Sequence, residues 1–167
     1  MIRRRSLHVS LQVAIVSVLS FYFGVHFTQF FQGESAGIGG LWAAISSIVV
    51  LQATQKATIE SAWMRALGTL IGASTSALYF QFFPFSFWGM GTTIFATVLL
   101  CEMLNIPDNA RLASITVCII MVMASLNPSI NPYLNSILRF SESMIGIALS
   151  MAAIVMWPTD AESKSEK

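Results

Sequence analysis

Long apolar segments separated by short polar turns constrain the fold of this chain more than any other feature of its sequence. A transmembrane helix needs about 20 apolar residues, because the hydrocarbon core of a bilayer is about 30 Å thick. Six segments approach that length, and we expect helices over about residues 7–31, 37–54, 64–83, 85–104, 112–126 and 135–157. The sequence therefore predicts an all-α, polytopic membrane helix bundle of about six transmembrane helices.

The composition of the chain also favours a membrane protein. Charged residues make up only 10% and hydrophobic residues 55%, whereas soluble domains average about 25% charged residues. A water-soluble domain of this size buries only about two thirds of the surface that its unfolded chain exposes, so we expect lipid to cover the remaining apolar surface. The formal net charge of +1 attracts no polyanion, and we expect the lipid bilayer, not nucleic acid, as a partner.

Turn-forming residues set the boundaries of the predicted domain. Asn, Pro, Gly and Asp occur at residues 32–35, 105–108 and 127–132, and Pro158 stops the last apolar segment. We expect one transmembrane domain over residues 1–158 and a disordered cytoplasmic tail over 159–167. Three arginines precede the first apolar segment, which is longer than the core of a cleaved signal peptide, and we predict a retained signal anchor there.

The distribution of lysine and arginine predicts the orientation. Cytoplasmic loops of membrane proteins carry an excess of these residues. With the N-terminus in the cytoplasm, eight of the nine Lys and Arg residues fall on the cytoplasmic side, and Arg139 is the exception. Six spans return the C-terminus to the same side. We therefore expect a multi-pass protein of the cell inner (plasma) membrane with both termini in the cytoplasm.

An internal repeat links the third and sixth predicted helices. Four pairs of identical residues are separated by 74 positions: Arg65 and Arg139, Ile71 and Ile145, Gly72 and Gly146, Ser76 and Ser150. Chance and shared membrane composition are the alternative explanation. Two halves of three spans, about residues 7–83 and 85–157, must have opposite orientations, and inverted repeats are common in transporters. The sequence thus predicts two inverted three-helix repeats, which would also explain the unusual side of Arg139.

Small residues line one face of each of these two helices. Gly68, Gly72 and Ser76 are spaced four residues apart on the third helix, and Gly146 and Ser150 have the same spacing on the sixth. Small residues at this spacing let helix backbones approach closely in lipid. We predict a helix-packing role for all five, either as ordinary intramolecular packing or as a seam between the two repeats or between subunits.

Charged residues inside the predicted spans are the candidates for function. Arg65 and Arg139 each stand at the predicted start of a helix, where free N–H groups and the helix dipole favour an anion, and arginine binds a carboxylate in bidentate fashion. Snorkelling of both side chains to lipid headgroups is the alternative. Glu142, about two turns into the sixth helix, is predicted to couple transport to protons, or else to neutralise Arg139 one turn earlier.

Other polar, aromatic and sulfur-containing residues carry weaker signals. Gln52 lies among hydroxyl-bearing neighbours at the inner end of the second helix, where it either contacts a solute near Arg65 or forms an ordinary helix end. All four tryptophans lie near predicted span ends, which is typical of an aromatic belt at the membrane interface. The sequence holds no catalytic motif, and Cys101 and Cys118 have neither metal-ligand nor disulfide spacing, so we predict neither an enzyme nor a bound metal or cofactor.

A tryptophan and an arginine–glycine segment form a recognisable pattern. Trp42 opens one span, and residues 65–73 read Arg-x-x-Gly-Thr-x-x-Gly-Ala at the opening of the next. This pattern resembles the membrane domain of the fusaric acid resistance and aromatic acid exporter superfamily, and the resemblance implies efflux of aromatic or other organic acids. Plant malate channels are similar, with a six-helix domain that works as a dimer and has basic residues along its pore. The residues that carry over are Trp42, Gln52, Arg65, Gly68, Thr69 and Gly72, and further Arg139 and Gly146.

Together these features predict gradient-driven efflux of aromatic or other organic anions by a homodimer or a larger assembly. Arg65, Arg139, Gln52 and Thr69 would contact the organic anion substrate, and Glu142 would couple its movement to protons. The sequence holds no nucleotide-binding motif, so a gradient is the expected energy source. A passive anion channel and a non-transporting membrane subunit of a larger complex are the alternatives.

Overall fold

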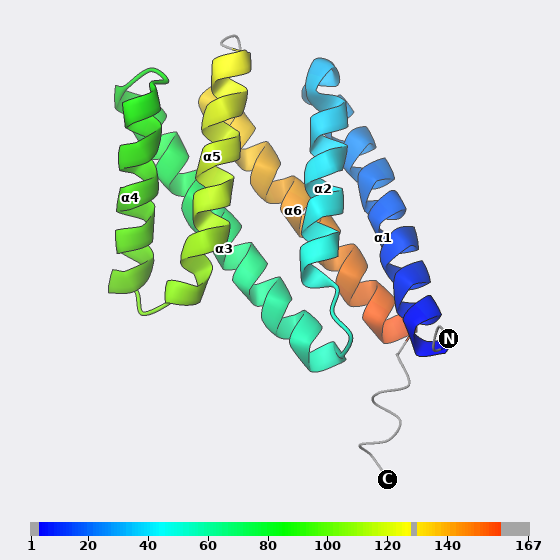
Figure 1. The fold of residues 1–167 in the computed structure, drawn as a ribbon. Coiled ribbons are helices and arrows are strands. Elements are labelled where there is room, and N and C mark those ends of the chain that lie inside the picture. The colour runs from blue at the N-terminus through cyan, green and yellow to red at the C-terminus, as the bar shows by residue number, and fades with distance from the viewer. Residues whose placement is uncertain (1–3, 128–129, 158–167) are drawn as a thin grey trace. The chain divides into compact units, whose positions relative to one another are not determined.

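The computed structural model describes residues 4–127 and 130–157, and every regular element in this part of the chain is helical (Figure 1). The prediction of an all-α fold is therefore confirmed. The predicted tail, residues 159–167, lies outside the described residues. In chain order the elements are α1 (Arg4–Gln29), the 3-10 turn η1 (Gly33–Ser35), α2 (Ala36–Val50), α3 (Gln55–Phe82), α4 (Phe87–Met103), the 3-10 turn η2 (Pro107–Asn109), α5 (Ala110–Leu126) and α6 (Pro132–Met156).

Three of the helical segments are long and apolar enough to cross a membrane. These segments are Leu7–Gln29, Pro107–Leu126 and Pro132–Met156, and the helices Ala36–Val50 and Phe87–Met103 are apolar but shorter. They identify the chain as a membrane protein, and the structure confirms the six helices. Six complete spans remain a prediction, because α2 and α4 have only 15 and 17 residues.

The starts of α3 and α6 differ from those predicted. The apolar segments had placed these starts at residues 64 and 135, but α3 begins at Gln55 and α6 at Pro132. Lys56 and Glu60 interrupt the apolar pattern without interrupting the helix, because backbone hydrogen bonds within a helix do not depend on side-chain polarity. Arg65 consequently lies ten residues inside α3, and Arg139 lies seven residues inside α6. The prediction that both arginines stand at helix N-termini was wrong.

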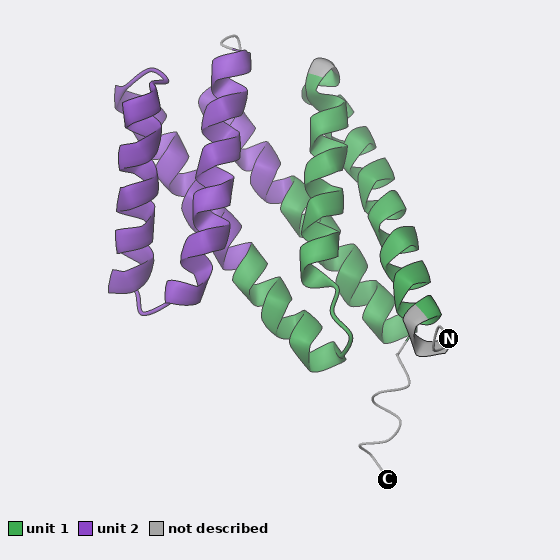
Figure 2. Ribbon diagram, viewed as in Figure 1, with its two compact units in different colours: residues 1–65, 142–167 green, residues 66–141 purple. Residues whose placement is uncertain are grey.

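The chain divides into two compact units (Figure 2). Unit 1 comprises residues 1–65 and 142–167, and unit 2 comprises residues 66–141. Helix α3 leaves unit 1 after Arg65, and helix α6 returns to it after Ser141. Unit 1 therefore holds the pair α1 and α2 with parts of α3 and α6, and unit 2 holds the pair α4 and α5 with the other parts of the same two helices.

Glycines bring α1 and α2 together in unit 1. A Cβ atom on Gly24 would lie 2.8 Å from the carbonyl oxygen of Gly39, and one on Gly40 would lie 2.8 Å from that of Phe21. No side chain fits between backbones at that separation, so α2 packs closely against the C-terminal half of α1 (Figure 1). Gln12, in the N-terminal half of α1, connects this helix to the C-terminal end of α6. Its Nε2 donates to the carbonyl oxygens of Ala153 and Trp157 at 3.3 and 3.2 Å.

Unit 2 is built in the same manner around α5. A Cβ atom on Gly68 would lie 2.7 Å from the Leu112 side chain, and one on Gly72 would collide with the backbone carbonyl of Ala113. Asn135 of α6 donates from Nδ2 to the carbonyl oxygen of Ile120 at 3.3 Å. Parts of α3 and α6 thus both pack against α5, and α4 lies beside it (Figure 1).

The element boundaries repeat with the same spacing as the two arginines. At three boundaries, the residue numbers in the first and second halves of the chain differ by 74. They are the ends of α1 and α4 at Gln29 and Met103, the starts of η1 and η2 at Gly33 and Pro107, and the ends of α3 and α6 at Phe82 and Met156. The sequence repeat had matched only the third and sixth helices, and these boundaries show the same spacing for further elements.

Buried hydroxyl groups are satisfied largely within their own helices. A serine or threonine in a helix can donate to the carbonyl oxygen four residues earlier, which removes a polar group from lipid without a second helix. Such bonds join Ser46 to Trp42, Ser76 to Gly72, Thr93 to Gly89, Thr116 to Leu112, Ser136 to Pro132 and Ser150 to Gly146, at 2.8 to 3.0 Å.

Candidate functional site

A cluster of buried polar side chains lies in the core of unit 1. We call it the unit 1 polar cluster, and it comprises Thr28 of α1, Ser46 of α2, Arg65 of α3, and Glu142 and Ser143 of α6. Each of these side chains is at most 1% exposed. Charged groups at such depth in a membrane bundle are costly and usually mark substrate or ion pathways, so this cluster is the candidate site.

Arg65 is held by one serine and one tryptophan of α2. Its Nε and Nη2 donate to Ser46 Oγ at 3.2 and 3.0 Å, and its guanidinium carbon lies 4.6 Å from the centroid of the Trp42 ring. Ser46 Oγ lies 2.9 Å from the Trp42 carbonyl oxygen and 3.1 Å from Ser143 Oγ. The guanidinium group is therefore fixed against α2, and Ser46 connects it to α6.

Trp42 does not belong to an aromatic belt. The sequence had placed it near a span end, whereas α2 begins at Ala36 and carries Trp42 two turns inside, with only 2% of the side chain exposed. Trp63 and Trp88, by contrast, are 67% and 88% exposed. The prediction for Trp42 failed because the buried cation on α3, which attracts the electron-rich face of the indole, cannot be inferred from the spacing within α2.

Glu142 accepts a hydrogen bond from the end of α1. Thr28 Oγ1 donates to Glu142 Oε1 at 2.6 Å. Gly39 makes room for this bond, because a Cβ atom at that position would overlap Thr28 Oγ1 and lie 2.5 Å from Glu142 Oε1. The contact therefore requires three residues from three helices, Thr28 of α1, Gly39 of α2 and Glu142 of α6.

Glu142 also lies deeper than the sequence suggested. It was predicted about two turns into its helix, but α6 runs from Pro132 to Met156, so Glu142 is ten residues from one end and fourteen from the other. At a rise of about 1.5 Å per residue it lies about 15 Å from the nearer end. This depth favours a functional carboxylate, and neutralisation of Arg139 stays the alternative.

Both arginines are buried, which argues against snorkelling to headgroups. Arg139, in unit 2, is 1% exposed like Arg65. Thr69 of unit 2 is also fully buried, and its hydroxyl is among the buried polar atoms of the described residues for which no hydrogen-bond partner is found. A contribution of either residue to substrate binding remains a prediction.

The five predicted helix-packing residues all lie at close helix contacts or on buried faces. In unit 2, Gly68 and Gly72 face α5, and Ser76 is buried with its hydroxyl on the Gly72 carbonyl. In unit 1, a Cβ atom on Gly146 would collide with the carbonyl oxygen of Ala43 in α2. Ser150 Oγ lies 3.1 Å from the Ser47 carbonyl oxygen of the same helix.

Gln52 does not join the unit 1 polar cluster. It lies in the turn between α2 and α3 with an exposed side chain, and its Nε2 donates to the Val49 carbonyl oxygen at 2.9 Å. Its backbone N–H donates to Thr58 Oγ1 at 3.0 Å. Both bonds are local, which matches the alternative of an ordinary helix end.

Sequence reasoning missed Thr28, Gly39 and Ser46. The adjacent glycines 39 and 40 inside an apolar helix were a usable signal, because glycine weakens a helix unless a close approach requires it. Thr28 carried no signal, since its partner is 114 residues away. Within the described residues, no group of three or more His, Cys, Asp or Glu could hold a metal ion.

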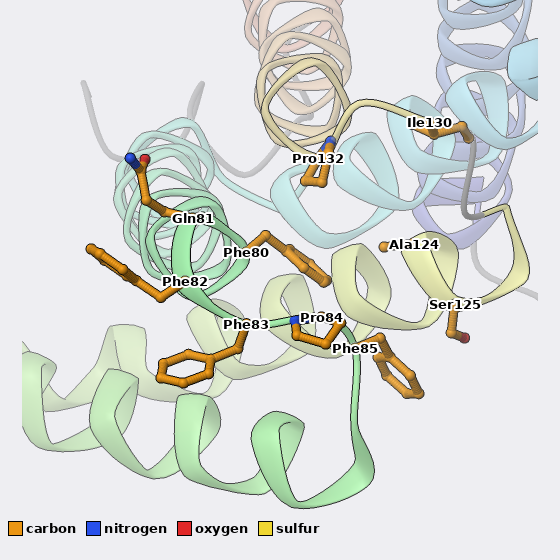
Figure 3. A pocket seen from close by; sticks show the side chains of 10 residues that line it. All are labelled: Phe80, Gln81, Phe82, Phe83, Pro84, Phe85, Ala124, Ser125, Ile130 and Pro132. Carbon is orange, nitrogen blue, oxygen red and sulfur yellow. The ribbon is translucent and has the colours of Figure 1, made fainter.

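A separate pocket of about 550 Å³ lies in unit 2 (Figure 3). It is formed where α3 ends and α6 begins, and four phenylalanines and two prolines line much of it. Figure 3 shows Phe83, Pro84 and Phe85 on the turn that follows α3. None of the residues predicted to bind substrate lines this pocket, so the candidate site remains the buried cluster of unit 1.

Buried charges in the core of a helical membrane protein are typical of the class of solute transporters. Within that class, the chain is a member of the fusaric acid resistance protein-like family, whose model matches residues 13–153. The predicted resemblance is confirmed, and the family indicates membrane transport or resistance as the general function. Comparisons with curated proteins and with solved structures gave no significant match.

Proposed function

We propose that the protein exports aromatic or other organic anions across the inner membrane. The observation that carries this proposal is the burial of Arg65, a permanently charged group, inside a helix of a protein from a transport family. A guanidinium group has five N–H donors, and Ser46 accepts from two nitrogens of Arg65. The remaining donors suit a carboxylate, which pairs with arginine through two parallel hydrogen bonds.

Trp42 supports an organic rather than a small inorganic anion. Its ring covers one face of the Arg65 guanidinium, so that a carboxylate approaches the edge of the guanidinium beside an aromatic surface. The apolar part of an aromatic acid gains contact with such a surface, whereas chloride does not. We propose Arg65, Arg139 and Thr69 as substrate contacts, and we leave Gln52 out because its side chain bonds locally.

We further propose that Glu142 couples transport to protons. At this depth a carboxyl group is stable in two forms: charged, if hydrogen-bond donors surround it, or protonated and neutral. The two forms differ little in size. The hydrogen bond from Thr28 favours the charged form, and the exclusion of water around Glu142 favours the neutral one. Such a group can change its protonation state as the protein changes conformation.

Two inverted repeats are part of the proposal. Support comes from the recurrent 74-residue spacing of element boundaries, and from a reciprocal packing of glycines. Gly72 on the third helix of the first half packs on α5 of the second half, and Gly146 on the third helix of the second half packs on α2 of the first. We propose that these two contacts are the seams of a transporter that works as a homodimer or a larger assembly.

The test is transport by purified protein in proteoliposomes, with a labelled aromatic carboxylate and an imposed pH gradient. We expect Arg65→Ala to abolish transport and Arg111→Ala to retain it, because Arg111 is an exposed arginine on α5. Size-exclusion chromatography verifies that both variants are folded. Transport by Arg65→Ala at the wild-type rate would refute the proposal.

A passive anion channel uses the same Arg65 without coupling. Planar-bilayer recording distinguishes the two functions, since resolved single-channel openings that persist without a pH gradient indicate a channel. A non-transporting subunit is distinguished by binding: an aromatic carboxylate that binds the folded protein raises its melting temperature, and a subunit without a substrate site shows no such rise.

A further inference from the structure

The Thr28–Glu142 hydrogen bond connects the middle of α6 to the last turn of α1. Thr28 is the penultimate residue of α1, and its carbonyl oxygen accepts from the N–H groups of Phe31 and Gln32 at 3.0 and 2.8 Å, which ends the helix. The residues directly after it are exposed, with Phe30 at 88%. The chain thus passes within a few residues from the contact with a fully buried carboxylate to an exposed turn.

The geometry of this contact suits a proton better than a metal ion. Thr28 Oγ1 and Glu142 Oε1 are 2.6 Å apart, the separation of a strong hydrogen bond to a charged oxygen. A sodium or calcium ion bound to both oxygens would hold them farther apart and would need several more oxygen ligands. Gly39, which leaves just enough room for the pair, offers no side-chain oxygen.

We infer that Thr28 is the positioning residue of a proton-binding site at Glu142, and that this site exchanges protons with the side of the membrane reached by the turn between α1 and α2. The inference rests on the proposed function and deepens it. In the predicted orientation that side is the outer one. Gly39 is the second positioning residue, because any larger side chain would displace the Thr28 hydroxyl.

The proton transfer is balanced by a rotation of the Thr28 hydroxyl. When Glu142 is charged, the Thr28 O–H donates to Oε1. When a proton from water adds to Oε1, the new carboxyl O–H donates to Thr28 Oγ1 instead. The Thr28 proton then turns to the carbonyl oxygen one helical turn earlier, which is an ordinary acceptor for a helical threonine. The Thr28 hydroxyl and Glu142 Oε1 therefore stay hydrogen-bonded to each other in both states.

Few charged groups lie near Glu142. The α2 residue that faces it is Gly39, which does not titrate. Helix α3 contributes Arg65, connected through Ser46 to Ser143 beside Glu142, and α6 itself carries Arg139 one turn earlier. On α1, His26 is exposed and its Nδ1 contacts the Tyr22 carbonyl oxygen, away from the cluster. The Thr28 hydroxyl is therefore the neighbour that a substitution can remove without changing any charge.

The experiment compares Thr28→Val, which has nearly the shape of threonine, with Thr28→Ser, which keeps the hydroxyl. Transport is measured in proteoliposomes as the pH is varied separately on each side. Loss of one hydrogen bond to a charged carboxylate is worth about 1.5–3 kcal/mol, or roughly 1–2 pH units. We expect Thr28→Val to move the midpoint of the pH profile to more alkaline values by about that amount, and Thr28→Ser to restore the wild-type midpoint.

Infrared spectroscopy gives a readout that does not require transport. The carbonyl band of a protonated carboxyl group is recorded in lipid as a function of pH, and Glu142→Gln identifies the Glu142 contribution. The same alkaline shift in Thr28→Val is expected, with Thr92→Val, an exposed threonine of α4, as the control. Gly39→Ala, which would push the Thr28 hydroxyl away from Glu142, is a second variant expected to give the same shift. If this variant does not fold, Thr28→Val alone tests the proposal, because it adds no atoms to the contact.

The two levels of the proposal fail in different ways. If wild-type transport does not depend on pH, or Glu142→Gln behaves as wild type, proton coupling at Glu142 is refuted and the present inference fails with it. If wild type and Glu142→Gln differ but Thr28→Val has an unchanged midpoint, only the role of Thr28 is refuted. A response of the Glu142 band to pH on the opposite side of the membrane alone would overturn the assignment of the side.

Discussion

The guanidinium group of Arg65 lies under the indole ring of Trp42, with 4.6 Å between the guanidinium carbon and the ring centroid. A cation–π contact of this kind is worth about 2 kcal/mol when it is shielded from water. We expect Trp42→Ala to weaken binding of an aromatic carboxylate by roughly tenfold or more and to lower the melting temperature. Trp42→Phe, which keeps an aromatic face, should be affected much less.

Isothermal titration and thermal unfolding in detergent measure both effects. Trp63→Ala is the matched control, because Trp63 is exposed and its loss removes no contact to Arg65. Equal binding by wild type and Trp42→Ala would show that the ring is a packing residue and has no part in anion recognition.

Because Gly146 packs directly against the backbone of α2, we expect a single added methyl group to lower the stability strongly. In Gly146→Ala the new Cβ collides with the Ala43 carbonyl oxygen, a backbone atom that cannot rotate away, so α6 must move from α2. Overpacking of this kind costs about 1–3 kcal/mol. Gly91→Ala is the control, since a Cβ there meets nothing within 4 Å and alanine favours a helix by about 0.5–1 kcal/mol.

Thermal unfolding in detergent micelles should therefore show opposite shifts for the two alanine variants. A Gly146→Ala protein as stable as wild type would mean that α2 and α6 are not in close contact in the membrane.

Gln12 fixes the C-terminal end of α6 to α1 through two carbonyl oxygens. Each hydrogen bond contributes about 1 kcal/mol, so we expect Gln12→Ala to lower the melting temperature by several degrees while leaving the Arg65 site intact. Gln29→Ala, at an exposed position of the same helix, should have no comparable effect. A similar loss of stability in both variants would instead indicate a general weakening of α1.

Cysteine labelling tests the predicted orientation. In a protein whose Cys101 and Cys118 have been replaced, a cysteine at Gly33 should react with a membrane-impermeant maleimide added to intact cells, and a cysteine at Lys56 should react only after the membrane is opened. Both positions are exposed, so burial does not explain a difference. Labelling of both cysteines from the same side would exclude a span between them.

Hydrophobic segments were enough to predict the six helices, since the apolar length that a bilayer demands is visible in the sequence itself. The first residues of α3 could not be predicted in the same way, because a charged residue such as Lys56 ends an apolar segment without ending a helix. The start of α6 was hidden by Pro132, which was assigned to a turn although proline is tolerated in the first turn of a helix. These two errors also placed both arginines at helix starts.

The candidate site could be predicted only in part. Arg65, Arg139 and Glu142 were found because a charge within an apolar segment is conspicuous. Thr28 was missed, since a lone threonine near a helix end is unremarkable until its distance to Glu142 is known. For Gln52 the resemblance to the family pattern outweighed the plainer expectation of a helix end, and the local hydrogen bonds of its side chain agree with the plainer one.

The hydroxyl groups that bond within their own helices have a consequence for how the protein is made. A helix whose serines and threonines already donate to its own carbonyls can leave the translocon for lipid before any neighbour arrives. Arg65 lacks this independence, because its hydrogen bonds go to Ser46 on the preceding helix. Helix α3 is therefore expected to stay beside the insertion machinery until α2 is in place, which makes the order of synthesis part of the route to the native bundle.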